Sequence, residues 1–572
     1  MGRGEQGVEN QEQQSATLED YASLYRVFLT REGFEPSKSA FRDFCAENGF
    51  KWSCSEYSLS IIRECAFDKY KDLKDSVFNE TMITKEYHDR VEKAIKTYRS
   101  FIVTSAVVSK AVNLEFFDAL RTYAKKNHSA VLILPCADAS NNEGRKVFKY
   151  NFDPVLNKYD NVFILMKNGK TDSYFITPDL AICTIEQSAK KVYSLAGLDE
   201  IVVINNATTI LGSPKQEKRA IPTFKENIPK YLCSTGSVTM DNYNDECYMS
   251  KRTSMKAKWA HVYGAFIVER SLDGKKAFIR PVQASPDGSF TDLNIVYKSD
   301  GTTKRAEGTV LVNGDAHAGA HDNELYKFII SNFVISDYVD MIVLHDICDS
   351  ASCNHHEVND TITKVSRTQD NSCKLQQDIN NVVRYLNELT AYGKQVVVVN
   401  SNHDNFIERS IRALSVVTDK DYPNMQLHLG AWLYLSRNKN ANILEYLVTN
   451  NIELKLERPD LITWLGDSVS YKVHGVELGM HGHQGANGAK GSLTTTSRYV
   501  GKAVIGHSHS SAIKGKTFQV GTTSEMDMGY NKGLSSWTRT CCLVHADGTM
   551  QLIDFFPTTE GSYEYRAEQA IL

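Results

Sequence analysis

The sequence predicts an α/β protein with a mixed α/β N-terminal extension, and three observations support this. Short apolar segments alternate with helical patterns in the C-terminal half, and clusters of Asp, Asn and His directly follow these apolar segments. Hydrophobic residues make up 42% of the chain and charged residues 23%, which are ordinary values for a globular protein. Because loops at the carboxyl ends of strands in open α/β sheets meet at one edge, clusters far apart in sequence are expected to meet in space.

The length of 572 residues is too great for one ordinary hydrophobic core. We therefore expect a flexible tail over residues 1–16, which are rich in Gly, Gln and Glu. A helical domain over 17–104, a mixed α/β extension over 105–300 and a C-terminal domain over 301–572 follow in this prediction.

Three short helices are expected after the tail. The first spans 18–31, the second is capped by Ser37 and stops at Gly49, and the third begins at a capping box of Ser53 and Glu56. The residues expected to face inward are Leu18, Tyr21, Leu24, Tyr25, Phe28, Phe41, Phe44, Cys45, Leu59 and Ile62. Such a unit is either a helix-turn-helix that binds DNA, or a helical cap or oligomerisation arm. The second alternative is favoured because no basic cluster marks a DNA-recognition face.

The extension mixes strand and helix patterns. Buried strands are expected over 130–134, 162–165 and 201–204. Asp273-Gly274 and Asp287-Gly288 are dipeptides typical of tight turns between strands.

A basic segment with interleaved aromatic residues spans 215–259. It contains nine basic and five acidic residues, with Tyr243, Tyr248 and Trp259 among them. Such a segment is able to hold a phosphate backbone and stack bases, or it is a solvated surface whose aromatic residues point inward. The DNA-binding residues that we predict here and in the Gly-, Ser- and Thr-rich segment 485–501 are Lys251, Arg252, Lys256, Lys258, Lys490 and Arg498.

Five polar clusters carry the chemistry of the C-terminal domain. Strands are expected over 310–312, 341–344, 396–399, 476–478 and 503–505, with a helix over 375–389. The clusters that follow these strands are Gly314-Asp315-Ala316-His317, His345-Asp346, Asn402-His403-Asp404, His481-Gly482-His483 and Gly506-His507-Ser508-His509. Carboxylates, amide oxygens and neutral imidazoles suit Mn, Fe or Zn, and no cysteine lies in any cluster.

This order of motifs resembles the calcineurin-like metallophosphoesterase superfamily over residues 309–555. The resemblance implies a β-sandwich flanked by helices and two divalent metal ions, most often Mn(II), with Mg, Fe or Zn as alternatives. Its implied ligands are Asp315, His317 and His509 for the first ion, Asn402, His481 and His507 for the second, and Asp346 as the bridge. His403 is then the proton donor or transition-state stabiliser, and Asp404 orients it.

The motifs depart from the superfamily pattern at His345 and Ser401, where Gly is usual. His483 is an alternative ligand to His481. A separate zinc site is another alternative, although the spacing of its residues fits no common pattern; these residues are Cys348, Cys353, His355 and His356. His321 is expected in the cleft or at a helix cap, and Asp349 is expected to support the bridging loop.

The overall arrangement also resembles the early-expressed DNases of T-five-like bacteriophages. This implies a manganese-dependent deoxyribonuclease that degrades host DNA in the host cytoplasm. A phosphomonoesterase or small-molecule phosphodiesterase is the alternative, and a DNA-binding protein with a structural metal site is a third hypothesis.

The expected partners are DNA and further copies of the chain. The net charge of −4 does not by itself indicate a nucleic-acid ligand, so any surface that binds DNA must be a local basic patch. No apolar segment approaches the roughly 18 residues needed to cross a bilayer, so no membrane insertion is expected. The scattered cysteines indicate a reducing compartment. No glycine-rich P-loop motif supports a nucleotide cofactor.

Overall fold

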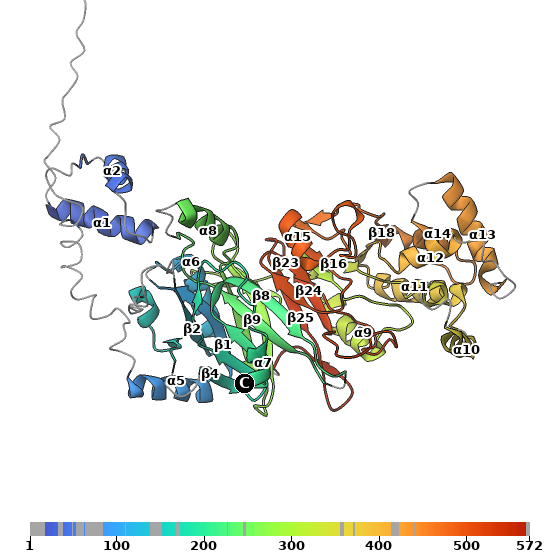
Figure 1. The fold of residues 1–572 in the computed structure, drawn as a ribbon, viewed down its shortest axis with the longest axis horizontal. Coiled ribbons are helices and arrows are strands. Elements are labelled where there is room, and N and C mark those ends of the chain that lie inside the picture. Colours follow the sequence, from blue (N-terminus) through green and yellow to red (C-terminus); the bar gives the residue numbers. More distant parts are fainter. Residues whose placement is uncertain are drawn as a thin grey trace, which may run out of the picture.

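The computed structural model describes most of the chain. The described residues are 18–32, 38–48, 50–52, 62, 84–108, 110–137, 152–167, 172–225, 227–243, 248–354, 360–369, 372–412, 422–438 and 442–567. They form a mixed α/β protein with several sheets, in which the helices within residues 361–449 lie at the end remote from the helix of residues 18–32 (Figure 1). Among these residues, no helix combines the length and the apolar character needed to span a membrane.

Two helices near the N-terminus confirm the first two predicted helices. They are α1 (Leu18–Glu32) and α2 (Lys38–Glu47). Tyr25 packs edge-on against Phe41 with 5.6 Å between ring centroids, and Phe41 packs against Trp52 in the same way. The predicted capping box at Ser53 and Glu56 lies outside the described residues.

The extension begins with α5 (Lys85–Thr97), which Thr84 caps through the backbone N–H of Tyr87. A sheet follows in the order β11-β10-β1-β2-β3, with β6 also paired to β2. Its strands are β1 (Ser100–Val107), β2 (Ser129–Ala137), β3 (Val162–Ile164), β6 (Gln187–Ser188), β10 (Gly264–Arg270) and β11 (Ala277–Gln283). Buried residues of α6 (Leu114–Lys126) pack on this sheet, and a short 3-10 helix η2 (Pro154–Asn157) precedes β3. The strands predicted over 130–134 and 162–165 are therefore confirmed.

Turns in the extension follow the predicted dipeptides. Asp273-Gly274 lies in the hairpin between β10 and β11, and Gly274 has a φ of 72°. Asp287-Gly288 turns the chain from β11 into a small separate sheet of β12 (Phe290–Asp292), β13 (Ile295–Tyr297) and β14 (Thr303–Arg305). Gly288 has a φ of 79°, and a β-carbon there would lie 2.3 Å from the Glu115 side chain. Glycine is therefore needed at this position.

The strand predicted over 201–204 is wrong, because these residues belong to the helix α7 (Glu200–Asn205). Val202 is buried, whereas Val203 and Ile204 are 72% and 80% exposed. A short run of β-branched residues cannot be assigned by periodicity alone. The strand in this part of the chain is the next segment, β7 (Thr208–Leu211). It pairs with the strands of residues 180–183 and 230–236.

A ten-stranded sheet joins the extension to the C-terminal segment, in the order β19-β20-β21-β23-β22-β8-β9-β7-β5-β4. The two sets meet where β8 pairs antiparallel with β22, with Lys218 opposite Ile513. The strands from the extension are β4 (Ser173–Thr177), β5 (Leu180–Cys183), β7, β8 (Ser213–Ile221) and β9 (Lys230–Gly236). Those from the C-terminal segment are β19 (Lys472–Val473), β20 (Val476–Glu477), β21 (Ala503–Ile505), β22 (Ala512–Lys514) and β23 (Thr517–Gln519). The predicted domain boundary near residue 300 therefore separates two segments of the chain that both contribute strands to one sheet.

A second sheet in the C-terminal segment has the order β18-β17-β16-β15-β24-β25. Its strands are β15 (Thr309–Val312), β16 (Val339–Leu344), β17 (Gln395–Val398), β18 (Ile462–Trp464), β24 (Thr540–Val544) and β25 (Met550–Asp554). The first four run parallel, and β24 and β25 are antiparallel to their neighbours. The strands predicted over 310–312, 341–344 and 396–399 are confirmed.

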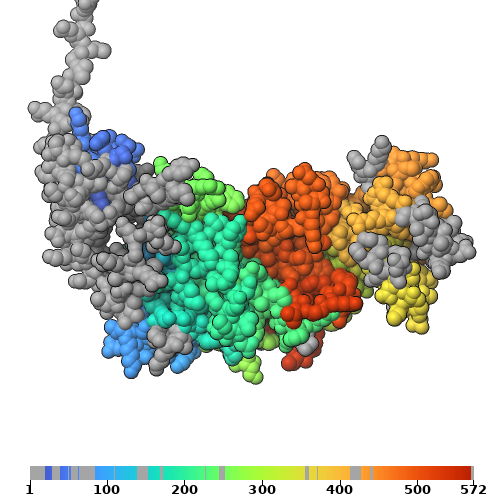
Figure 2. Space-filling view, in the orientation of Figure 1, coloured from blue at the N-terminus to red at the C-terminus, as the bar shows by residue number. Residues whose placement is uncertain are grey.

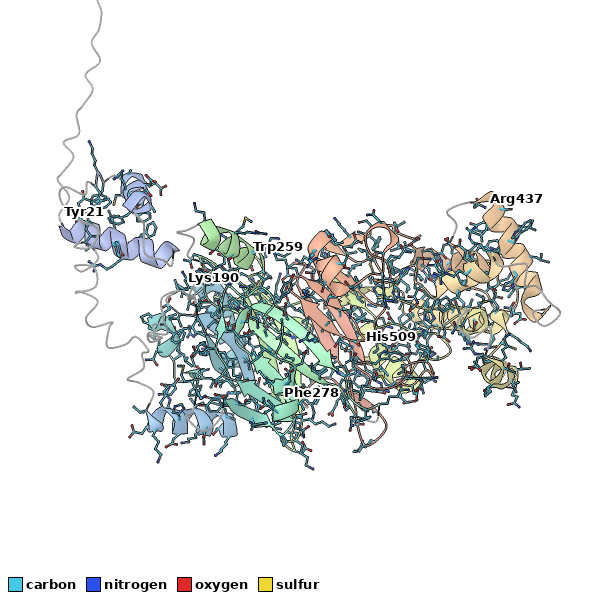
Figure 3. The ribbon with its side chains drawn as sticks, viewed as in Figure 1. Tyr21, Lys190, Trp259, Phe278, Arg437 and His509 are labelled. Carbon is cyan, nitrogen blue, oxygen red and sulfur yellow. The ribbon has the colours of Figure 1, made fainter. Side chains whose placement is uncertain are left out.

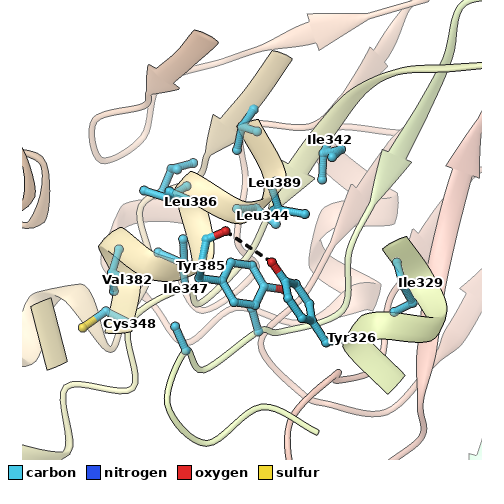
Figure 4. Packing of buried hydrophobic residues seen from close by; sticks show 14 of the residues in the cluster. Tyr326, Ile329, Ile342, Leu344, Ile347, Cys348, Val382, Tyr385, Leu386 and Leu389 are labelled. Carbon is cyan, nitrogen blue, oxygen red and sulfur yellow. Dashed lines mark hydrogen bonds between the residues drawn. The ribbon is translucent and has the colours of Figure 1, made fainter. Parts of the chain in front are cut away.

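The two faces of this second sheet have different partners. Val310, Val312 and Val343 pack with Val504 and Phe518 of the ten-stranded sheet. The opposite face packs on helices, and Figure 4 shows part of this core, in which the Tyr326 hydroxyl donates to the Tyr385 carbonyl oxygen at 3.3 Å. The C-terminal segment thus has two packed sheets with helices on the outer face of one.

The remaining elements complete the C-terminal segment. The helices are α9 (Asn323–Ile329), α10 (Thr361–Gln369), α11 (Leu375–Thr390), α12 (Asp404–Arg412), α13 (Tyr422–Arg437), α14 (Ile443–Thr449) and α15 (Leu493–Tyr499). Short turns are the π-helical η3 (Ile330–Val334) and the 3-10 helices η4 (Ala351–Cys353), η8 (Pro459–Leu461) and η9 (Ala486–Gly488), and β26 (Phe556–Pro557) pairs with β27 (Tyr563–Glu564). The helix predicted over 375–389 is confirmed as α11.

Candidate metal centre

The five polar clusters meet at one place although they span nearly 200 positions of the chain. Each follows a strand, in order β15, β16, β17, β20 and β21. The side chains that converge are buried: Asp315, His317, Asp346, His481 and His509 are each at most 4% exposed. Figure 3 places His509 in the C-terminal half of the molecule.

One group of ligand atoms lies around His317 and His509. Their Nε2 atoms are 3.1 Å apart. Asp315 Oδ2 lies 3.2 Å from His509 Nε2, and Asp346 Oδ2 lies 3.8 Å from His317 Nε2.

A second group lies around Asn402. Its Oδ1 atom is 3.0 Å from His481 Nε2 and 2.9 Å from His507 Nδ1. Asp346 Oδ2 lies 3.3 Å from His481 Nε2. The backbone N–H of His507 donates to Asp315 Oδ2 at 2.8 Å, which ties the second group to the first.

Asp346 belongs to two sets of ligand atoms suited to a metal ion. One set is His317, Asp346 and His509, and the other is Asp315, Asp346 and His481; within each set the ligand atoms lie within 4.8 Å of one another. The Asp346 carboxylate is therefore the residue that these two sets share.

The chemistry of this donor set fits a metal ion. Asp315 Oδ1 and Asp346 Oδ1 are buried and have no hydrogen-bond partner within the part of the chain that the structure describes. Of two imidazole nitrogens 3.1 Å apart, only one can donate to the other. Buried carboxylates and imidazoles so arranged are satisfied by a cation that accepts their lone pairs.

The buried charges perturb one another strongly. Burial by itself raises the pKa of Asp346, but His403 and His481 outweigh it and hold that pKa well below its usual range. Burial lowers the pKa of His507 to about 4, as His481 also does, so this imidazole is neutral and able to bind a metal near neutral pH.

The backbone at the cluster adopts conformations that non-glycine residues rarely adopt. His317, Asp346, His507 and His509 have φ values of 45°, 47°, 78° and 57°. Such left-handed residues cost free energy and concentrate at functional sites. Gly506 allows the close approach of these loops, because a β-carbon there would lie 2.2 Å from Asp315 Oδ1.

His403 lies beside the first group and is held by Asp349. Its Nδ1–H donates to the Asp349 carbonyl oxygen at 2.7 Å, and its ring centroid is 4.7 Å from that of His317. This hydrogen bond fixes a proton on Nδ1, so in the neutral ring Nε2 carries the lone pair.

Asp404 does not orient His403 as the resemblance implied. Its Oδ2 accepts from the backbone N–H of Ser401 at 2.9 Å, and its own N–H donates to Ser401 Oγ at 3.3 Å. Asp404 is the first residue of α12, so its side chain folds back on the preceding turn instead of reaching the imidazole.

Asp349 has a larger role than the sequence indicated. Its Oδ1 lies 3.0 Å from His317 Nδ1, and with His317 and His403 it forms a third set suited to a metal ion. A carboxylate that holds the second nitrogen of a metal-binding imidazole fixes the orientation of that ring. The spacing of three residues after Asp346 was the only signal for this role in the sequence.

The two departures from the family pattern fit the local backbone. The left-handed conformation lies at Asp346 and not at His345, so a side chain at 345 is tolerated. His345 is fully buried beside the His481 ring, and burial lowers its pKa to about 4. Ser401 uses its backbone N–H and hydroxyl to hold Asp404.

The alternative imidazoles and thiols are also placed by the structure. The His483 ring lies 5.4 Å from the His481 ring. Of these two histidines, His481 belongs to a set of metal-suited ligand atoms found among the described residues, and His483 does not. His321 packs on Tyr326, and its Nδ1 accepts from the Gly319 N–H. Cys348 and Cys353 are buried, whereas His355 and His356 of the alternative zinc site lie outside the described residues.

The predicted DNA-binding surface is reduced to part of its segment. Lys215, Lys218 and Tyr243 are buried, and Lys218 pairs with Asp554 in the interior, so these three residues are not available to a DNA strand. A strand that pairs on both sides, β8, turns these lysines inward. The exposed residues are those of α8 (Tyr248–Trp259), namely Lys251, Arg252, Lys256 and Lys258, together with Lys490 and Arg498 on the segment after His483.

The fold and the cluster define a mixed α/β protein with buried His and Asp groups that are able to bind a metal ion. The chain is similar to Protein A1 of Escherichia phage T5, with 28% identity over 483 residues that span 81% of this chain and 82% of that protein. No family model matches the chain. No solved structure matches it either.

Proposed function

We propose that this protein is a two-metal-dependent phosphodiesterase that hydrolyses DNA. The observation that carries the proposal is the position of Asp346, which belongs to two sets of metal-suited ligand atoms in one buried cluster. The resemblance of the motif order to calcineurin-like metallophosphoesterases supports the same proposal.

The proposed ligands are those predicted from the motifs. Asp315, His317 and His509 hold one divalent ion, Asn402, His481 and His507 hold the other, and Asp346 serves both. When bound, two such ions neutralise the charge of a phosphodiester and activate water for attack. The oxygen and imidazole donors suit Mn, Fe or Zn, and Mn(II) is the proposed ion because the resemblance to metallophosphoesterases implies it.

His403 has the position of a proton donor in this proposal. Its Nδ1–H is committed to the Asp349 carbonyl oxygen, so a second proton on Nε2 is available to the leaving oxygen. Asp349 holds both His403 and His317, which keeps the donor beside the ligands.

DNA is the proposed substrate because of features outside the metal cluster. The helix α8 exposes four cationic side chains, and the sheet that includes β8 and β22 connects the extension to the metal-binding segment. The similarity to a phage protein supports the further proposal that the DNA is that of an infected host cell, in its cytoplasm.

The test is a comparison of substrates and metals. The purified chain is incubated with linear DNA, supercoiled plasmid and an aryl phosphodiester, each with Mn(II), with Mg(II) and with chelator. We expect DNA cleavage that depends on metal and far exceeds cleavage of the small ester. Efficient cleavage of only the small ester would identify a small-molecule phosphodiesterase, and metal binding without cleavage would identify a structural metal site.

A further inference from the structure

A cleft separate from the metal cluster lies between the extension and the C-terminal segment. It has a volume of about 80 Å³ and opens to solvent. Its walls come from the end of α8, the segment around Tyr193, α15 and the turn between β22 and β23. Figure 2 shows the surface dipping between light-green α8 and the orange segment that contains α15.

The rim of this cleft is cationic. Arg498, Lys514 and Lys516 all line it. Arg498 Nη2 donates to the Tyr193 hydroxyl at 3.2 Å, and Lys514 Nζ lies 4.5 Å from the centre of the Tyr193 ring. These contacts hold two positive groups beside one aromatic ring.

The acidic residue that lines the cleft, Glu217, is held by hydrogen bonds inside the protein. Glu217 is buried, and its Oε2 accepts from Ser194 Oγ at 2.9 Å and from the Leu195 N–H at 3.2 Å. Its charge is therefore engaged inside the protein, and the cleft presents a net positive rim.

The cleft also has an apolar floor and exposed aromatic walls. Val192, Ala260 and Val262 line it, and Tyr193 and Trp259 are 43% and 61% exposed. Trp259 is the last residue of α8, and Figure 3 places it beside the C-terminal half. Two exposed aromatic rings over an apolar floor offer a stacking surface for a planar base.

We propose that this cleft binds one nucleotide unit of single-stranded DNA, with the phosphate on Lys514, Lys516 and Arg498 and the base against Trp259 and Tyr193. A single strand is favoured over a duplex because paired bases are not available for stacking on side chains. The inference rests on the proposed function for the identity of the ligand as DNA, but binding in the cleft does not require the metal cluster.

The cleft is close enough to the metal cluster for one DNA strand to contact both. β21 connects Gly501, which lines the cleft, to His507 in the cluster. Six residues of extended chain reach at most about 20 Å. A DNA strand whose nucleotide is held in the cleft thus needs to continue over only a few nucleotides to reach the metal cluster.

The test is binding of a fluorescein-labelled ten-residue oligothymidylate, measured by anisotropy in chelator so that no hydrolysis contributes. The double variant Lys514→Ala, Lys516→Ala should bind at least tenfold more weakly and with a smaller salt dependence. Trp259→Ala should lose between about fivefold and a hundredfold, the range for loss of one stacked base, while Trp259→Phe retains most of the affinity.

A matched control is the pair Lys125→Ala, Lys126→Ala, which removes two exposed lysines at the end of α6. Wild-type affinity in the control and unchanged thermal stability in all variants support the proposal. Unchanged affinity in both cleft variants would overturn it, whether or not the protein cleaves DNA. Competition by thymidine monophosphate equal to that by the oligomer would overturn the assignment to a single strand, and duplex binding as tight as the oligomer would do the same.

Discussion

The Asp346 carboxylate lies between the imidazoles of His481 and His317. Its Oδ2 atom is 3.3 Å from His481 Nε2 and 3.8 Å from His317 Nε2. We predict that Asp346→Asn lowers the content of both metals and abolishes DNA cleavage, because one neutral amide would replace the charge that serves both ions. Metal content by mass spectrometry and turnover measure this. The control is Asp340→Asn, which changes an exposed residue of β16, the strand that precedes Asp346. Two tightly bound metals with near-normal turnover in Asp346→Asn would refute the shared role.

His403 separates proton transfer from metal binding. We predict that His403→Gln keeps its metals and its fold but turns over DNA roughly 10²–10⁴-fold more slowly, the range for loss of a positioned proton donor. His88→Gln, which alters an imidazole bonded to Tyr174 far from the cluster, should retain full turnover. If the metal content of His403→Gln falls in parallel with its activity, His403 is a ligand in the set that it forms with His317 and Asp349.

Gly506 tests whether the loops must pack as closely as the structure shows. A β-carbon there would lie 2.2 Å from Asp315 Oδ1, whereas one at Gly466 would meet only Val469 at 3.5 Å. We predict that Gly506→Ala displaces Asp315 and weakens metal affinity at least tenfold, while Gly466→Ala does not. Calorimetric titration with Mn(II) measures the difference, and equal affinities in the two variants would contradict the packing.

At the residue scale, the sequence predicted which side chains converge but not how they contact one another. Asp315, Asp346 and His481 each follow a strand, and the rule that strand ends share an edge brought them together. The hydrogen-bond partner of His403 could not be predicted, because it is the backbone carbonyl oxygen of Asp349 and not a carboxylate. The Asp404 carboxylate accepts from the backbone N–H of Ser401 instead.

The helix α8 carries the cationic face that remains exposed. We predict that replacing Lys251, Arg252, Lys256 and Lys258 together by Ala weakens duplex DNA binding and lowers its salt dependence by about 0.9 in slope for each lost phosphate contact. Cleavage of a small phosphodiester should persist, because the metal ligands are elsewhere. The control removes Lys85, Lys93 and Lys96 from α5. An unchanged salt slope would place the DNA on another surface.

The helix α11 contains a buried carboxyl group that makes stability depend on pH. Burial raises the pKa of Asp378 from 3.8 to about 7, although Ser352 donates to it from its hydroxyl and backbone N–H. Because the folded protein binds this proton more tightly than the unfolded chain, the stabilisation is complete below about pH 4 and lost as pH rises to about 7.

We therefore predict that the free energy of unfolding of the wild type, relative to Asp378→Asn, falls by up to about 1.4 kcal/mol per pH unit in this window and is constant above it. Urea denaturation of both proteins between pH 5 and pH 8 measures the difference. A difference that rises with pH would contradict the assignment.

At the element scale, strands buried on both faces were predictable because their apolar runs are long enough to be distinctive, as in β2 and β17. The helix α7 was not, because four β-branched or apolar residues fit either structure and only packing decides. The inward orientation of Lys215 and Lys218 was equally hidden, since burial of a lysine depends on partners such as Asp554 that lie far away in sequence.

The molecule as a whole is joined by the pairing of β8 with β22, whose residues are almost 300 positions apart. No local pattern in the sequence indicates such a pairing, because register between distant strands depends on the three-dimensional arrangement. The pairing explains how the extension can form one wall of a cleft whose other wall belongs to the C-terminal segment.

Crystals grown with Mn(II) and measured at the manganese absorption edge would show whether this molecule holds two metal ions that share Asp346. We predict two anomalous peaks, one beside His317 and His509 and one beside His481, Asn402 and His507, with the Asp346 carboxylate contacting both. A single peak in the cluster, or two peaks of which only one contacts Asp346, would contradict this prediction.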